Sequence, residues 1–490
     1  MARAGDLRSW AMSDLASPVP HAPAGLASTV GALRDSGWTS RRVAQELREN
    51  LERRIADGEP LALGILGYED SVLPQLENAI LAGHDVILLG ERGQAKTRIL
   101  RSLVGLLDEW LPIVATSEIN DDPFAPVSRR AIELVETHGD ETPVSWVHRS
   151  ERYGEKLATP DTTIADLIGE IDPIKIAEGR YLSDEQALSF GLVPRVNRGI
   201  FAVNELPDLA ERIQVGLLNV LEERDIQIRG HRIRLPLDLV LVATANPEDY
   251  TNRGRIITPL KDRFGAQIRT HYPRDVDTEL EIARNESSLP STDVPIAVPW
   301  FIELAVVQIS QLARRSPMVN QRSGVSVRLT IANYESVVAN ALRRTLRTHG
   351  SAVVPRVSDL AAVVASTQGK IEIEAMEEGR EADVVAQLVA ASVLLVFREH
   401  VVLEDAAEIV AAFDDEVVVH VGDDLDAADY TEVLEALPVL EPATRRIAGE
   451  DAGTEEMAAA LEFLLEGLHL TKRLSKDASG PRALYRQRRR

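Results

Sequence analysis

The chain contains no cysteine, and this absence excludes three classes of site at once. Thiolate metal sites, cysteine nucleophiles and disulfide frameworks all require the missing thiol. Aromatic side chains are scarce as well, at 4% of the residues, which argues against a base-stacking platform for nucleic acid. No apolar run approaches the roughly 18 residues of a membrane span, and Asp6 and Asp14 interrupt the first twenty positions. The composition therefore predicts neither secretion nor a membrane segment, and we expect a cytoplasmic protein.

Positive charge is also in short supply, because 54 Lys and Arg face 77 Asp and Glu and the formal net charge is −23. Such an anion is repelled by nucleic acid and by acidic membranes, so we expect neither as a partner. Between residues 371 and 440, nineteen acidic residues face only Arg380 and Arg398. Two interpretations of this acidic stretch stay open, a solvated helical face and an acidic docking surface.

A length of 490 residues predicts about three structural units. From about residue 61 to 275, short apolar runs alternate with helical segments, which is typical of a parallel sheet covered by helices. Beyond that point long helical periodicity takes over. We expect a flexible arm at 1–38, an α/β core with a docking helix and an insert at 39–275, a helical lid at 276–350, an acidic, mostly helical region at 351–475 and a basic tail at 476–490.

The docking helix is predicted from apolar residues at four-residue intervals. Val43, Leu47, Leu51 and Ile55 fall on one helical stripe, and Gly58 ends it. Thr39 and Ser40 precede the stripe and are the expected N-caps.

The strongest chemical signal is a buried strand at 86–89, followed by a glycine-bearing loop and a helical pattern from about Lys96. This context is typical of a phosphate loop, in which backbone amides surround the phosphates, Lys96 reaches them and the Thr97 hydroxyl ligates Mg²⁺. Ala95 stands where the motif usually has its last glycine, and its methyl group is tolerable at negative φ but obstructive at positive φ. The nucleotide-binding residues predicted here are Gly90, Glu91, Arg92, Gly93, Gln94, Ala95, Lys96 and Thr97.

Two further buried runs end in polar residues. The run 199–203 leads into Asn204 and Glu205, and the run 237–245 leads into Asn246. In a parallel sheet all three side chains lie at the carboxyl edge, where ligands bind. Phosphoryl transfer to water requires a group that orients Mg²⁺ and a group that polarises the water. Asn204 suits the first role without bringing negative charge, Glu205 suits the second, and Asn246 suits positioning of the water or sensing of the γ-phosphate.

Two arginines complete the predicted catalytic set. Arg263 lies within a Lys-Asp-Arg-Phe segment, where a guanidinium can stabilise charge on the transferring phosphoryl group of a neighbouring subunit. Arg328 opens a helix of the following helical region and can reach the nucleotide from the lid side.

Taken in order, these motifs resemble an AAA+ ATPase, and within that superfamily the branch of the magnesium-chelatase I subunit and MoxR. The resemblance covers roughly residues 61–335 and is carried by Gly90–Thr97, Phe190–Glu205, Leu217–Arg224 with Ile226–Ile233, Ala243–Pro247 and Lys261–Phe264. It implies a P-loop α/β core followed by a helical lid, a homo-oligomeric ring that is usually a hexamer, and ATP with Mg²⁺ as cofactors.

The resemblance also implies roles for individual residues. Lys96 and Thr97 correspond to Walker A, and Asn204 and Glu205 to Walker B, with Thr97 and Asn204 at the metal. Sensor 1 is Asn246, the arginine finger Arg263 and sensor 2 Arg328. A hairpin is expected around Gly230, and a strand-bearing insert between the two Walker motifs. Members of the branch typically act with a von Willebrand factor A (VWA) partner, which they remodel, or assist metal insertion.

Three functions compete at this stage. The leading hypothesis is an ATP-hydrolysing motor that remodels a partner protein. A nucleotide-gated scaffold or regulator with weak or no hydrolysis is the alternative, motivated by Ala95 and Asn204. A DNA-acting transcriptional regulator is disfavoured by the net charge of −23 and the few aromatic residues.

Overall fold

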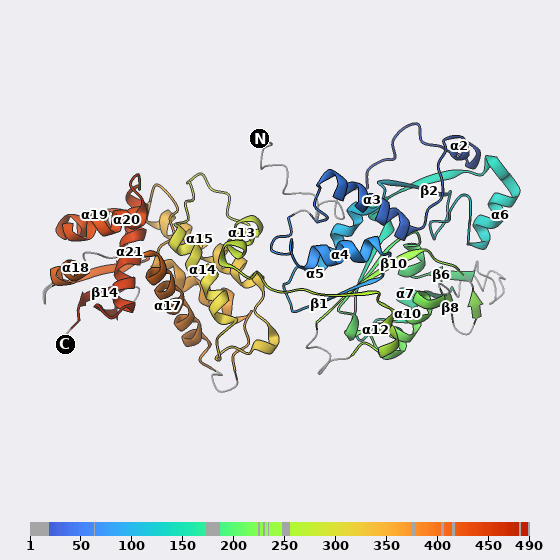
Figure 1. The fold of residues 1–490 in the computed structure, drawn as a ribbon. Helices are drawn as coiled ribbons and strands as arrows, with labels where there is room; N and C mark the ends of the chain where they lie inside the picture. The colour runs from blue at the N-terminus through green and yellow to red at the C-terminus, as the bar shows by residue number, and fades with distance from the viewer. Residues whose placement is uncertain are drawn as a thin grey trace. The chain divides into compact units, whose positions relative to one another are not determined.

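The computed structural model describes residues 19–62, 64–172, 187–223, 226–228, 231–233, 235–246, 255–374, 379–402, 406–413, 417–479 and 482–488. The chain divides after His271 into two compact units, which we describe separately (Figure 1).

The first unit is built on a five-stranded parallel sheet with the order β11-β1-β10-β7-β4 (Figure 1). Its strands are β1 (Val86–Leu89), β4 (Tyr153–Leu157), β7 (Gly199–Asn204), β10 (Leu239–Ala245) and β11 (Ala266–Arg269). Strands β1, β7 and β10 are the three predicted apolar runs, and all of their residues are buried. A parallel sheet needs cover on both faces, which accounts for these uninterrupted apolar runs.

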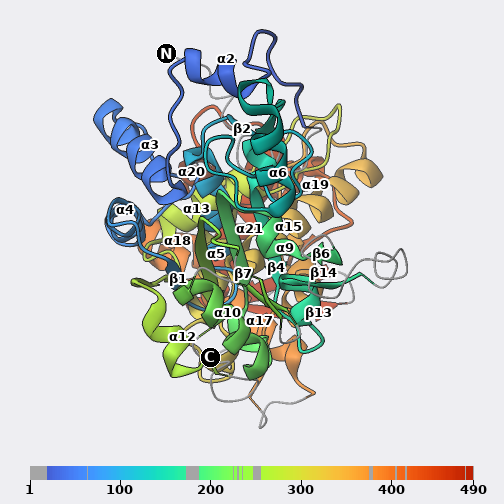
Figure 2. The ribbon, with the colours of Figure 1, turned by 90° about the vertical axis from the view of Figure 1, so that its right-hand side faces the viewer.

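Alternate residues of the strands enter two different cores, as the pleat of a strand requires. Val86 and Leu88 belong to one core, and Ile87 and Leu89 to the other. Figure 2 shows α3 and α4 together on one side of the unit, and α10 and α12 together on another. The first core takes residues from α3 (Val43–Asp57), α4 (Val72–Leu81), α5 (Lys96–Ser102) and η1 (Leu103–Leu106). The second takes residues from α7 (Ile164–Leu167), α9 (Leu192–Arg195), η5 (Leu206–Asp208), α10 (Glu211–Glu223) and α12 (Thr258–Arg263).

The predicted docking helix is α3, and Gly58 ends it in the left-handed conformation at φ 72°. The predicted caps Thr39 and Ser40 are wrong, because the N-cap is Arg42 and its side chain makes no capping bond. A distant carboxylate replaces the local cap: the backbone N–H of Val43 donates to Asp238 Oδ2 at 2.7 Å. Asp238 immediately precedes β10 and is distant from α3 in sequence, so the residues next to the helix cannot reveal this cap.

Part of the predicted N-terminal arm is ordered. Residues Val30–Asp35 form α2, capped by the Thr29 hydroxyl, which accepts from the Ala32 N–H. Val30 and Leu33 are buried in a small cluster with Val144. The contact with Val144 buries apolar side chains of α2, which the composition of the arm alone would leave exposed. The expectation of a flexible arm is therefore wrong for α2.

The insert between the two Walker segments carries strands, as expected from the resemblance. Its elements are β2 (Trp110–Val114), α6 (Arg129–His138), η2 (Gly139–Glu141), β3 (Val144–His148), η3 (Arg149–Arg152), β5 (Gly169–Ile171) and β6 (Leu188–Phe190). β2 pairs with β3, and β5 with β6, both antiparallel. The predicted hairpin is present as β8 (Ile226–Ile228) paired antiparallel with β9 (His231–Ile233), while Gly230 lies outside the described residues.

The second unit is mainly helical around one continuous core, which runs across the boundary predicted at residue 350. Phe301 and Phe463 stack at its centre with ring centroids 4.5 Å apart. Within the described ranges, no helix is long and apolar enough to cross a bilayer. The helices are α13 (Val276–Glu286), α14 (Trp300–Ala313), η6 (Gln321–Ser323), α15 (Val327–Thr348), η7 (Val357–Ala362), α16 (Val363–Gln368), α17 (Glu381–His400), α18 (Ala406–Ala412), α19 (Ala427–Ala436), η9 (Pro438–Leu440), α20 (Glu441–Ala448) and α21 (Thr454–Leu470).

Within the predicted basic tail, 476–490, residues 476–479 and 482–487 lie in strands. β13 (Leu474–Ser479) and β14 (Arg482–Gln487) form an antiparallel sheet with β12 (Val419–Gly422) in the order β12-β14-β13. Tyr485 anchors this sheet, because it is buried and its hydroxyl donates to Glu466. Burial raises the pKa of Tyr485, and the adjacent Glu466 carboxylate adds to the effect.

Candidate nucleotide site at the carboxyl edge of the sheet

The loop between β1 and α5 is tightly packed at its first glycine. A Cβ atom on Gly90 would lie 1.9 Å from Thr270 Oγ1 and 2.2 Å from Gln94 Oε1. Those two groups are bonded, since the Thr270 hydroxyl donates to Gln94 Oε1 at 2.6 Å. The same amide oxygen accepts from the Glu91 N–H at 3.1 Å. Gly90 is therefore required by the side chains that brace the loop, and Gln94 is one of those braces.

Ala95 adopts the left-handed conformation, with φ 54° and ψ 12°. The sequence left two options open for this position, and the structure takes the strained one. A left-handed backbone costs an L-residue about 1–2 kcal/mol relative to the right-handed region. The loop therefore keeps the backbone path that suits glycine while carrying a methyl group.

Lys96 is almost fully buried and turns its ammonium group back on the loop. Its Nζ donates to the carbonyl of Gly90 at 2.6 Å and to that of Glu91 at 2.7 Å. The ammonium group therefore lies against the loop, where an ammonium group can donate to a phosphate oxygen.

Thr97 and Asn204, predicted to share a metal, are brought together. The Thr97 hydroxyl donates to Asn204 Oδ1 at 3.3 Å, and the Thr244 hydroxyl reaches the same oxygen at 3.3 Å. Asn204 ends β7 and Thr244 lies on the neighbouring strand β10, one position before the end of that strand. The first turn of α5 and the ends of two neighbouring strands therefore meet at one oxygen atom.

Glu205 follows β7 in the left-handed conformation, with φ 54° and ψ 49°. Its N–H donates to the Thr244 hydroxyl at 3.0 Å, which secures this unusual backbone. Its side chain is partly exposed. Non-glycine residues held in this region often mark functional sites, and three of them, Ala95, Arg198 and Glu205, occur in the motifs that carry the family resemblance.

Glu155 on β4 was missed by the sequence analysis. Its Oε1 accepts from the Asn204 amide nitrogen at 2.7 Å. Arg101 of α5 donates two hydrogen bonds of 2.7 and 2.8 Å to the same carboxylate, and the Tyr153 hydroxyl donates to it at 3.1 Å. Burial and the neighbouring Glu155 carboxylate raise the pKa of Tyr153 well above its ordinary value. The sequence shows Glu155 only as one charge in an insert, since its significance arises from β4 lying beside β7.

Tyr68 is a second residue without a sequence signal. Its hydroxyl lies 3.0 Å from the carbonyl oxygen of Gln94 in the loop and 2.7 Å from that of His271, where the first unit ends. Burial raises the pKa of Tyr68 to about 12. One buried phenol thus joins the phosphate loop to the residue that precedes the second unit.

Three further predicted site residues are Asn246, Arg263 and Arg328. Asn246 directly follows β10 and is buried, and Arg263 is the exposed last residue of α12. Arg328 is exposed near the start of α15 in the second unit, where its N–H donates to the Ser326 hydroxyl at 3.1 Å. The catalytic roles of these three residues stay predictions.

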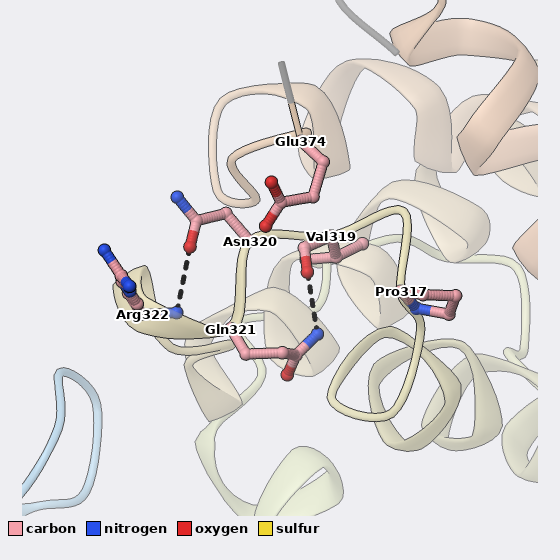
Figure 3. A pocket seen from close by; sticks show the side chains of 6 residues that line it. All are labelled: Pro317, Val319, Asn320, Gln321, Arg322 and Glu374. Carbon is pink, nitrogen blue, oxygen red and sulfur yellow. Dashed lines mark hydrogen bonds between the residues drawn. The ribbon is translucent and has the colours of Figure 1, made fainter. Parts of the chain in front are cut away.

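A hollow of about 450 Å³ lies elsewhere, in the second unit (Figure 3). It is lined by Pro317, Val319, Asn320, Gln321, Arg322 and Glu374. The amide of Gln321 is already used, because it donates to the carbonyls of Ala313, Ser316 and Val319 at 2.9–3.0 Å. This hollow holds none of the predicted site residues.

Residues 147–264 match the family described as AAA domain (dynein-related subfamily). The chain is 28% identical over 249 residues to the magnesium-chelatase 38 kDa subunit of Rhodobacter capsulatus, a match that covers 48% of this chain and 63% of that protein. It is 30% identical over 235 residues to the chloroplastic magnesium-chelatase subunit ChlI-1 of Arabidopsis thaliana, covering 46% and 51% respectively. The chain thus spans less than two thirds of the length of these relatives.

Among solved structures, the complex between subunits BchI and BchD of magnesium chelatase is similar at 22% identity and a TM-score of 0.33. The similarity covers 64% of this chain and 95% of that chain. At that score the likeness supports no argument about this chain.

Proposed function

We propose that this chain, an AAA+ protein of the magnesium-chelatase I branch, binds ATP with Mg²⁺ at the carboxyl edge of its parallel sheet and hydrolyses it. The observation that carries the proposal is the meeting of the phosphate loop with the ends of β7 and β10, where the Thr97 hydroxyl donates to the amide oxygen of Asn204.

The residues at this edge fit a magnesium nucleotide. Gly90 has no room for a side chain, and the buried Lys96 ammonium group donates to two neutral carbonyls of the loop. The Thr97 hydroxyl and the Asn204 amide supply oxygen donors, which Mg²⁺ prefers. Among the described residues no group of three or more His, Asp or Glu gathers as a metal site.

Each residue has a defined task in the proposed reaction. Lys96 neutralises phosphate oxygens, and Thr97 with Asn204 orients the metal, which when bound draws charge from the phosphates. Glu205 polarises the attacking water, with its position fixed by the bond from its N–H to Thr244. Asn246 positions that water, at the edge of the adjacent strand β10.

We further propose a homo-oligomeric ring, usually a hexamer in this branch, that remodels a partner protein, for which a VWA-domain protein is our candidate. The relatives are named as subunits, which supports action within a larger assembly. Arg263 is exposed at the end of α12, so a neighbouring subunit's nucleotide can approach its guanidinium. Arg328, near the start of α15 in the second unit, is our candidate for sensor 2.

A nucleotide-gated scaffold with weak or no hydrolysis is the second candidate. Two observations favour it: the left-handed Ala95 in the loop and the neutral amide of Asn204 at the metal position. Such a protein would change conformation on nucleotide binding without rapid turnover.

Phosphate release under steady-state conditions separates the two candidates. Lys96→Ala should abolish tight nucleotide binding, whereas Glu205→Gln should retain binding and stop turnover. The exposed Glu141→Gln, which makes the same chemical change away from the edge, serves as the control. Binding without phosphate release in the unmodified chain would favour the scaffold, and unaltered turnover in both site variants would refute the ATPase.

A further inference from the structure

Three strands and one helix converge on the polar group of Asn204. In the parallel pairing of β4 with β7, Glu155 lies opposite Ala202, two residues before Asn204. Glu155 and Asn204 therefore point to the same face of the sheet as a diagonal pair. That face is covered by α5, which contributes Thr97 and Arg101 from successive turns.

The hydrogen bonds around Asn204 determine which way its amide faces. The amide nitrogen donates to Glu155 Oε1 at 2.7 Å, while the amide oxygen accepts from the hydroxyls of Thr97 and Thr244. A carboxylate can only accept, so turning the amide over would press two acceptor oxygens together. Glu155 consequently holds the amide oxygen of Asn204 toward Thr97.

Glu155 is itself held in place by cationic and phenolic donors. Arg101 donates twice to its carboxylate, and Tyr153 donates once. The pKa of Arg101 is raised, chiefly by its hydrogen bond to Glu155, so the guanidinium stays charged. With the bond to Asn204, the carboxylate accepts four described hydrogen bonds, which leaves it little freedom to rotate.

From this geometry we infer that Glu155 is a positioning residue for the magnesium site, and that Asn204 and Glu155 form one amide–carboxylate unit whose polarity can be exchanged. The inference rests on the proposed function. It explains why an amide occupies the place of a Walker B carboxylate: the single negative charge of this unit lies one hydrogen bond away, on β4.

Each single substitution should break the unit. Asn204→Asp would place two carboxylates in contact, and such a pair ionises fully only at a large cost. Glu155→Gln would place an amide between Arg101 and Asn204. Whichever way that amide turns, its nitrogen faces another donor.

The double variant Asn204→Asp, Glu155→Gln restores the bond between residues 155 and 204 in exchanged form and loses the bond from Arg101 Nη2 to Glu155 Oε1. The carboxylate introduced on β7 would accept from the glutamine amide introduced on β4 and from both threonine hydroxyls, while the glutamine oxygen accepts from Arg101. The inference therefore predicts two damaged single variants and a double variant that recovers. Two residues that act independently would instead give a double variant at least as damaged as the worse single variant.

The experiment compares the four proteins, each with the full chain, at about pH 8, where a shared proton is least available. The first readout is the thermal midpoint without nucleotide or metal. The second is the Mg²⁺ concentration at half-maximal binding of a fluorescent ATP analogue. Each single variant should need about tenfold more Mg²⁺ than the unmodified chain, and the double variant should return to within about threefold.

Control substitutions make the same chemical changes at exposed positions of the first unit. Asn78→Asp on α4 and Glu141→Gln in η2 should leave both readouts unchanged.

Two results would overturn the inference: a double variant no better than the worse single variant, or Asn204→Asp binding Mg²⁺ more tightly by itself. Failure of the proposed function would look different. The unmodified chain would then bind no magnesium nucleotide, while the thermal midpoints of the four proteins would still report whether residues 155 and 204 are coupled.

Discussion

The strained backbone at Ala95 leads to a stability prediction that needs no ligand. Replacing Ala95 by glycine keeps the loop path and removes the methyl group from a residue at φ 54°. The substitution thus removes a left-handed alanine directly before Lys96.

The expected gain is the difference between two effects. Relief of the left-handed conformation is worth about 1–2 kcal/mol in the folded chain. The greater conformational freedom of glycine in the unfolded chain lowers the free energy of unfolding by about 0.5–1 kcal/mol. Ala95→Gly should therefore raise the free energy of unfolding by about 0–1.5 kcal/mol, centred on about 0.75 kcal/mol, which corresponds to a rise of up to about 6 °C in the thermal midpoint for a unit of this size.

Tryptophan fluorescence is a suitable readout for the denaturation of the first unit. Trp38, Trp110 and Trp146 lie in that unit, and Trp300 lies in the second. Ala95→Val, with a branched side chain at the same backbone position, should lower the midpoint instead.

The matched control is the same substitution in a right-handed helix. Ala339 is exposed in the middle of α15, where Ala→Gly should cost about 1 kcal/mol by propensity alone. If Ala95→Gly destabilises its unit as Ala339→Gly destabilises the second, the backbone at residue 95 carries no strain and the reasoning is refuted.

Three further predictions concern other groups of the chain. Arg152→Ala leaves the buried Glu46 carboxylate without the guanidinium that it binds at 2.6 and 2.8 Å, and should cost about 3–5 kcal/mol in urea denaturation; a loss below about 1 kcal/mol would contradict this. If Arg263 acts in a neighbouring site, mixing Arg263→Ala with Lys96→Ala protein should recover part of the phosphate release that each lacks, whereas no recovery would argue against action in trans. Burial raises the pKa of Glu462, so its contribution to stability is present below the ordinary glutamate pKa of 4.5 and declines as pH rises above it. Glu462→Gln should flatten that decline in a series of thermal midpoints, and an unchanged pH profile would contradict the assignment.

The sequence was sufficient for the parts of the site that follow from local pattern. Apolar runs that end in polar residues located β7 and β10, and with them Asn204 and Asn246 at the sheet edge. The glycine-bearing segment after β1 located Lys96 and Thr97 in the same way. Periodicity and strand ends are encoded by neighbouring residues, so they can be read without the fold.

The missed features depend on contacts between distant segments. Glu155 matters because β4 lies beside β7, an adjacency that no local pattern specifies. The sign of φ at Ala95 is set by the packing of the whole loop, including Thr270, which follows another strand. The strand β14 lies in the segment predicted only as a basic tail, because its arginine-rich composition gives no local sign that the rest of the second unit buries Tyr485.

The central claim is that one nucleotide is held between the phosphate loop and the ends of β7 and β10. Equilibrium dialysis of ATP against the Glu205→Gln chain, with and without Mg²⁺, tests it most directly because turnover does not deplete the ligand. The account predicts one ATP per chain, bound more tightly with Mg²⁺, and loss of that binding when Lys96→Ala is added. Equal ATP binding with and without the Lys96 ammonium group would contradict it.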